Sequence, residues 1–201
     1  GNDISLNLDI FKRVEAVYQN ELKNLSEEDA RLTEISYIDF IRNGANLSKD
    51  DKIKIRKIDE EMSTLSPKFS NNNLNATNDF ELWLKKSDLV GLPEMVINSA
   101  KMEAKAKGKD DKWLVTLQFP SYYPFMKFSE RRDLREKLML ASSTKCNGGQ
   151  FDNSSICKKI AKLKHERAKL LGYDNFADYI LEKRMAEKQS NIFKLLDNLY
   201  D

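Results

Sequence analysis

DDKWLVTLQFPSYYPFMK, residues 111–128, decides the fold, because it interrupts a chain that is otherwise charged and helical in pattern. From Trp113 to Phe119 every second residue is a large apolar one, which is the period of a β-strand. Pro120 and Pro124 lack the N–H donor of other residues and fix φ, so we expect them to end this strand. The sequence therefore predicts a strand at about 113–119.

Aromatic side chains crowd the end of this strand. Phe119, Tyr122, Tyr123 and Phe125 fall within seven residues. We interpret them as an aromatic corner around which the flanking helices pack. The alternative is that Tyr122 or Tyr123 faces a ligand.

A second alternating stretch, residues 80–85, predicts a partner strand. Between the two strands, Pro93 suits the first position of a helix and Gly108 its C-terminal stop. If strands joined by a helix pair directly, they should be parallel, with a right-handed crossover.

The remaining sequence has the apolar spacing of amphipathic helices. Ser26 and Ser48 are good N-caps, and Pro67 should kink or restart the helix that contains it. We therefore predict a mainly α fold, a multi-helix lobe with one short two-stranded β element at about 80–85 and 113–119. The predicted helices cover about 5–24, 26–44, 48–74, 93–108, 129–146, 154–171, 175–184 and 190 onward.

Composition excludes some classes of function. The chain has 34 basic and 32 acidic side chains among 201 residues, so its bulk charge names no partner. No apolar run approaches the roughly 18 residues of a membrane span. Cysteine is scarce, which agrees with a reducing compartment, and we expect a cytoplasmic protein. Gly1-Asn2 without an initiator Met indicates sequence from within a longer protein, where an upstream export signal would be invisible.

Few residues offer catalytic or metal-binding chemistry. His165-Glu166 begins like the HExxH zinc-protease signature, but Lys169 occupies the second histidine position. His165 is the only histidine, and Cys146 and Cys157 form no CxxC pair, so neither a zinc cluster nor a catalytic triad is predicted. Cys157 near a helix start is expected to be an inert thiol. We therefore assign no catalytic, cofactor-binding or metal-ligating residue in this chain.

Two further features are candidate anion sites. The helix at 156–171 is strongly basic, yet it lacks interleaved aromatic residues and is expected to be a solvated face. The loop Asn147-Gly148-Gly149 follows a helix rather than a strand and has no GK[ST], so phosphate binding is not expected. We expect neither nucleic acid nor a membrane as partner.

Five segments occur in an order and spacing that resemble one family. They are GANLSKDDK at 44–52, DLVGLPEMV at 88–96, WLVTLQFPSYYPFM at 113–126, NGGQFDNS at 147–154 and HERAKLLGYDNFADY at 165–179. With FSNNNLNATNDFEL at 69–82, they closely resemble the N-terminal part of the thimet oligopeptidase and peptidyl-dipeptidase family of zinc metallopeptidases.

The resemblance implies that the whole chain, 1–201, is an N-terminal, helical, non-catalytic region of a larger zinc peptidase. Such proteins are two-lobed around a channel that admits short peptides. Their zinc, its HExxH histidines and its activating glutamate lie in a C-terminal catalytic half that is absent from this chain. The chain would then form one wall of the channel, be inactive alone, and act with short peptides and the catalytic half. The alternative is a stand-alone helical binding module without catalysis, and a weaker one is a nucleic-acid-binding helical protein.

Overall fold

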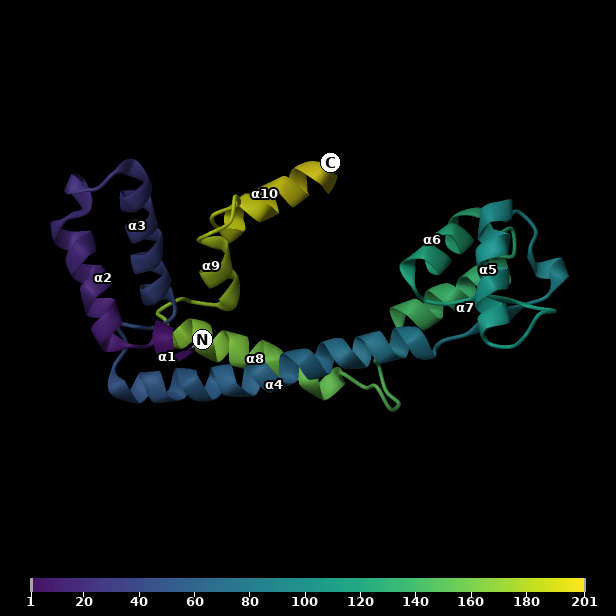
Figure 1. The fold of residues 1–201 in the computed structure, drawn as a ribbon, viewed down its shortest axis with the longest axis horizontal. Helices are drawn as coiled ribbons and strands as arrows, with labels where there is room; N and C mark the ends of the chain where they lie inside the picture. Colours follow the sequence, from purple (N-terminus) through teal and green to yellow (C-terminus); the bar gives the residue numbers. More distant parts are fainter. Residues whose placement is uncertain (1, 201) are drawn as a thin grey trace. The chain divides into compact units, whose positions relative to one another are not determined.

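Residues 2–200 are described by a computed structural model, and they are mainly helical (Figure 1). The chain divides into two compact units. Unit 1 contains the residues up to Thr64 together with those from Lys159 onward, and unit 2 contains Leu65–Lys158. Helices α4 (Lys49–Asp79) and α8 (Ser154–Leu170) each contribute one part to each unit. No helix among residues 2–200 is long and apolar enough to cross a membrane.

Unit 1 begins with a helical hairpin. After α1 (Asn2–Ser5), helix α2 (Leu8–Asn20) leads through the 3-10 turn η1 (Leu22–Asn24) to α3 (Glu27–Arg42). Ser26 caps α3 as predicted, its hydroxyl accepting the Asp29 amide. Phe11 of α2 is almost fully buried and stacks on Tyr37 of α3 at 5.9 Å between ring centroids. Aromatic packing therefore joins the two helices.

A buried arginine ties the end of this hairpin to the end of the chain. Arg42 is 8% exposed and donates to the carbonyl of Tyr179 at 2.6 Å and to the hydroxyl of Tyr173 at 3.0 Å. Its guanidinium pairs with Glu182 and lies over the Tyr179 ring, 4.3 Å from the centroid, so the charge is paired and stacked as a buried arginine requires. Tyr179 belongs to α9 (Phe176–Leu181), and α10 (Gln189–Tyr200) follows with several exposed apolar side chains, Phe193, Leu195, Leu196, Leu199 and Tyr200.

Unit 2 packs around a two-stranded sheet. Strand β1 (Leu82–Leu84) is followed by η2 (Lys86–Asp88), α5 (Glu94–Ala106) and β2 (Trp113–Val115), then by α6 (Phe119–Phe128) and α7 (Arg132–Ser143). Its core contains Leu84, Phe125 and Leu138, none of which exposes any surface. The mainly α fold with one short two-stranded element is confirmed.

The expected strand direction is wrong. β1 and β2 pair antiparallel, with Leu82 opposite Val115 and Leu84 opposite Trp113. A parallel pair needs only the two reversals of direction at the ends of the connecting helix. In this chain residues 85–93 add turns of their own, the 3-10 turn η2 and a left-handed Gly91 at φ +85°. That extra reversal brings β2 back against β1 in the opposite sense.

The predicted aromatic corner is a helix. β2 ends at Val115, and Phe119–Phe128 is helical with Pro120 in its first turn, where a missing N–H costs nothing. Val115 and Leu117 are buried as the strand pattern required, but Phe119 is 72% exposed because it has left the strand. A proline that starts a helix cannot be distinguished, from the sequence alone, from a proline that ends a strand. Pro120 starts a helix.

Several helix boundaries also differ from the prediction: the expected helix at 5–24 is divided into α1, α2 and η1, and α4 continues to Asp79. Pro67 lies inside an unbroken α4. Because proline has no N–H, the carbonyl of Ser63, four residues earlier, has no amide donor in the helix. Both residues are exposed, so water can reach this carbonyl. Helix α7 begins at Arg132 rather than at Ser129, whose amide still belongs to α6 through a bond to the carbonyl of Phe125. Ser48 does cap α4, accepting the Asp51 amide at 3.1 Å.

Candidate functional site

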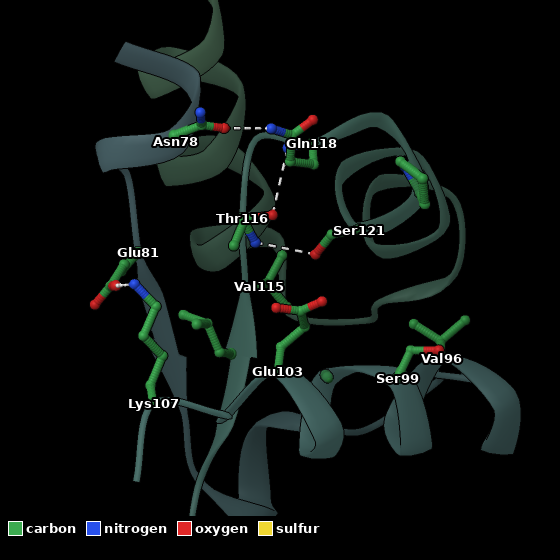
Figure 2. Close-up of a pocket in the computed structure, with 13 residues that line it drawn as sticks. Asn78, Glu81, Val96, Ser99, Glu103, Lys107, Val115, Thr116, Gln118 and Ser121 are labelled. Carbon is green, nitrogen blue, oxygen red and sulfur yellow. Dashed lines mark hydrogen bonds and ion pairs between the residues drawn. The ribbon is translucent and has the colours of Figure 1, made fainter. Parts of the chain in front are cut away.

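A cavity of unit 2 lies between α5, β2 and the start of α6, and we name it the α5–β2 pocket (Figure 2). Its volume is about 400 Å³, within the range of sites that bind small molecules or side chains. The lining residues are Asn78, Glu81, Val96, Ser99, Ala100, Glu103, Lys107, Leu114, Val115, Thr116, Gln118, Pro120 and Ser121.

Helix α5 supplies one continuous wall. Val96, Ser99, Ala100 and Glu103 have the spacing i, i+3, i+4 and i+7, so they share one face of the helix. The small side chains Ala100 and Ala104 are almost fully buried and let α5 pack closely on β2. The shape of the pocket therefore follows from a strip of small residues beside a short strand.

Polar contacts fix the rim on the α6 side. The Ser121 hydroxyl accepts the Thr116 amide at 2.9 Å, which links the first turn of α6 to the residue after β2. The Gln118 side-chain amide donates to the carbonyl oxygen of the Asn78 side chain at the end of α4. Figure 2 shows the Gln118–Asn78 contact at the top of the view and the Ser121–Thr116 contact below it, so this wall is held in place by hydrogen bonds.

The acidic side chains that line the pocket outnumber the basic ones. Glu81 and Lys107 pair at 2.9 Å, and the Trp83 indole also donates to Glu81. The hydrogen bond from Lys107 is the main reason why the pKa of Glu81 lies below its usual value. Glu103 has no ion pair or side-chain hydrogen bond among residues 2–200, and Figure 2 shows its carboxylate reaching toward Val115 and Ser121. The lining therefore carries one uncompensated negative charge.

Neither tyrosine of the ligand-facing alternative lines this pocket. Tyr122 packs against the core cluster of unit 2, and Tyr123 is 52% exposed and stacks on Phe119 at 5.4 Å. Packing against the core accounts for Tyr122. Tyr123 forms an exposed aromatic pair with Phe119, beside Pro120.

His165 is exposed on α8, next to a cavity of about 680 Å³ between α4 and α8 in unit 1. Glu166 follows it and pairs with Lys162 at 3.7 Å, while Lys169 pairs with Asp174 at 3.4 Å. A catalytic zinc needs three protein ligands, and the ammonium group of Lys169 stands where the helix would supply the second histidine. Residues 2–200 contain no group of three His, Cys, Asp or Glu side chains arranged for a metal ion. The residues present do not fit a catalytic zinc.

The two cysteines are free thiols. Cys146 and Cys157 line a shallow cavity of about 330 Å³ together with Phe69, Asn73 and Asn153. His165 lies eight residues beyond Cys157 on the same helix, a rise of about 12 Å. That distance is too long for His165 to serve as the base of Cys157.

The basic helix is largely compensated within unit 1. Lys159 pairs with Glu61 at 2.9 Å and Arg167 with Asp59 at 2.9 Å. Lys164 lies over the ring of Phe176, 4.9 Å from its centroid. Less free positive charge remains on α8 than its sequence indicates.

The glycine-rich loop is organised by one carboxylate. Asp152 accepts the Ser154 hydroxyl at 2.6 Å, the Gly148 amide at 3.0 Å and the Ser154 amide at 3.0 Å. Asn153, which is 5% exposed, then joins the loop to α4 through the Asn72 side chain and the Phe69 carbonyl. The amide of Gly148 is thereby occupied by the protein itself.

Sequence reasoning missed Glu103, Ser121 and Gln118. Glu103 lies outside the segments that resemble the family, whereas Gln118 and Ser121 lie within the segment at 113–126. Each gains its place in the pocket only when α5, β2 and α6 meet. The one signal in the sequence is an acidic residue in the last turn of the helix that Pro93 and Gly108 delimit, where acids are unfavourable.

Residues 125–201 match the family description Peptidase family M3. The probable cytosolic oligopeptidase A of Arabidopsis thaliana is 34% identical over 197 residues, covering 93% of this chain and 28% of that protein. Oligopeptidase A of Haemophilus influenzae is 34% identical over 185 residues, covering 89% of this chain and 27% of the relative. The dipeptidyl carboxypeptidase of Escherichia coli is 32% identical over 189 residues, covering 92% and 28%. The chain thus spans little more than a quarter of the length of these relatives.

Proposed function

Because the chain belongs to peptidase family M3, we propose that it is a non-catalytic region of a zinc metallopeptidase that cleaves short peptides. In this proposal its residues build part of the wall of the substrate channel. The chain is inactive alone and acts together with a C-terminal catalytic half that carries the zinc. The proposal places the region at the N-terminal side of the peptidase, as the resemblance of its motifs implies.

The observation that carries this proposal is the position of the only histidine. Catalytic zinc sites in peptidases keep three protein ligands and an open position for water. His165 is exposed, has Lys169 one turn away, and lacks any such ligand group around it in the described part of the chain. A chain that is this similar to peptidases and has no fitting donor set is best explained as a region that does not hold the metal.

The lengths of the matching proteins also support the proposal that the catalytic residues lie outside this chain. The relatives extend over about three and a half times the length of this chain, while nine-tenths of this chain matches them. The relatives' names, oligopeptidase and dipeptidyl carboxypeptidase, refer to short peptides and to removal of dipeptides from a C-terminus. We infer short peptides as the substrate class and leave both modes of cleavage open within it.

The α5–β2 pocket supports a channel-wall role. It is a hollow lined by both apolar and polar side chains, as expected of a surface that contacts peptides. We place the peptidase in the cytoplasm, as one relative's name states for that protein, although another is named chloroplastic and mitochondrial.

Metal analysis and peptide hydrolysis by the isolated chain test the proposal. After incubation with zinc and gel filtration, we expect no stoichiometric zinc and no cleavage of a quenched peptide substrate. One tightly bound zinc per chain, or hydrolysis abolished by His165→Ala, would overturn it. A stand-alone binding module would also be inactive, but it would fail to restore cleavage when combined with the rest of the peptidase.

A further inference from the structure

We propose that the α5–β2 pocket binds the cationic side chain of an arginine or lysine in a short peptide, with Glu103 as its counter-ion. The ligand class rests on the proposed function, which supplies the peptide. The position of the charge and its preferred partner rest on the pocket itself.

The charge balance of the lining comes first. Two carboxylates, Glu81 and Glu103, and one ammonium, Lys107, line the pocket. Lys107 is engaged with Glu81 at 2.9 Å, so the pair is neutral and Glu103 alone decides the sign of the potential. A ligand that places a cation beside Glu103 gains a charge-assisted hydrogen bond, whereas an anionic side chain would be repelled.

The other cations nearby have different partners. Lys101 lies over the Trp113 ring at 4.4 Å and donates to the Asp110 carbonyl. Lys109 lies over the Trp83 ring at 4.0 Å from its centroid. Neither lines the pocket, so neither is placed to neutralise Glu103.

The position of Glu103 in α5 adds to its negative potential. It lies in the last turn of α5, which ends at Ala106, and the unpaired carbonyls of that turn carry partial negative charge. An acidic side chain there works against the helix, and a bound cation removes this penalty. Glu103 is exposed and lines the pocket, so a cation that enters the pocket can reach its carboxylate.

The remaining lining suits a long cationic side chain. Val96, Ala100 and Val115 offer apolar contact for methylene groups. The hydroxyls of Ser99 and Ser121 are further hydrogen-bond acceptors in the lining, and Figure 2 shows both residues and Glu103 at the pocket. A guanidinium has five N–H donors, so arginine fits this set of acceptors better than lysine.

Peptide binding to the 201-residue chain tests the proposal by isothermal titration calorimetry. The probe is an acetylated and amidated pentapeptide with a central arginine, which excludes the terminal amine as the source of the cation. Its matched control carries citrulline, which keeps the shape of arginine without the charge. We expect the arginine peptide to bind about tenfold more tightly than the citrulline peptide, and a lysine peptide to fall between them.

Three variants locate the effect. Glu103→Gln should abolish the preference for arginine over citrulline. Glu136→Gln removes the same charge from an exposed position on α7 outside the pocket, and it should leave the preference unchanged. Lys107→Met frees Glu81, and the second uncompensated carboxylate should tighten binding of the arginine peptide.

Three results would overturn the inference. They are no measurable binding of the arginine peptide, equal binding of the arginine and citrulline peptides, and an unchanged preference in Glu103→Gln. These outcomes do not depend on zinc or hydrolysis, so they are separable from failure of the proposed function. That function fails instead if the isolated chain holds zinc or cleaves peptides, whatever the pocket binds.

Discussion

Lys107 and Glu81 lie 2.9 Å apart, from Nζ to Oε1, and join the residue that follows α5 to the residue that precedes β1. Glu81 also accepts the Trp83 indole N–H at 3.0 Å, so its carboxylate is held from two sides. As a result one of the two acids of the α5–β2 pocket is compensated and the other is not. The contrast between Glu81 and Glu103 gives the pocket its charge.

Glu103→Gln should leave the fold at least as stable as the original chain. The substitution removes an acid from the last turn of α5, where a negative charge opposes the helix dipole by about 0.3–1 kcal/mol. Thermal unfolding by circular dichroism measures this change. A clear drop in the midpoint would show that Glu103 stabilises the unit and would argue against a position kept for binding.

Gly91→Ala should destabilise unit 2 far more than Gly148→Ala. Both glycines have left-handed φ, +85° and +91°, which costs a residue with a Cβ about 1–2 kcal/mol. A Cβ at Gly91 would also lie 2.4 Å from the carbonyl oxygen of Phe128, whereas a Cβ at Gly148 meets nothing within 4 Å. Chemical denaturation of the two variants measures the difference, and equal losses would contradict the close approach of these segments.

Trp113→Ala should lower the free energy of unfolding by roughly 3 kcal/mol, because a large ring packed on the core cluster is lost. The buried indole N–H has no hydrogen-bond partner among the described residues, so Trp113→Phe should cost much less. Equilibrium denaturation compares the two variants. Equal losses would mean that the ring is not what stabilises this face.

Acid should weaken the loop around Asp152. Hydrogen bonds from the Ser154 hydroxyl, and then from the Gly148 and Ser154 amides, lower its pKa from 3.8 to about 2. A depressed pKa gives stability that is complete above pH 3.8 and is lost as the pH falls toward 2. The advantage of the original chain over Asp152→Asn should therefore shrink across this interval. NMR amide exchange at Gly148 follows it, and a difference independent of pH would show that the ionised carboxylate does not hold the loop.

Local signals predicted much of the fold. The N-caps Ser26 and Ser48 and the stop at Gly108 depend on bonds and dihedral angles of adjacent residues, so the sequence reports them directly. The prediction for Pro120 is wrong because proline favours a first helical turn as much as it ends a strand. The strand direction depends on how many turns lie between β1 and β2, which apolar spacing does not record.

The pocket could not be predicted from the sequence for a similar reason, because it depends on contacts between residues that are far apart in the chain. Glu103 acquires a role only where the small-residue face of α5 meets β2, and the pairing of Lys107 with Glu81 joins residues 26 positions apart. The expectation that His165 has no metal-binding partner rests on the spacing of residues along one helix, which is local in the sequence. Residue types that carry charge without a motif gain their meaning from tertiary contacts alone.

Complementation is the most direct test of the claim that this chain is a non-catalytic region of a family M3 peptidase. The 201-residue chain and the separately produced remainder of the natural protein are assayed singly and together, with a quenched short peptide and added zinc. The account predicts that cleavage appears only when both are present and persists with His165→Ala. Full activity of the remainder alone, or loss of the restored cleavage with His165→Ala, would contradict it.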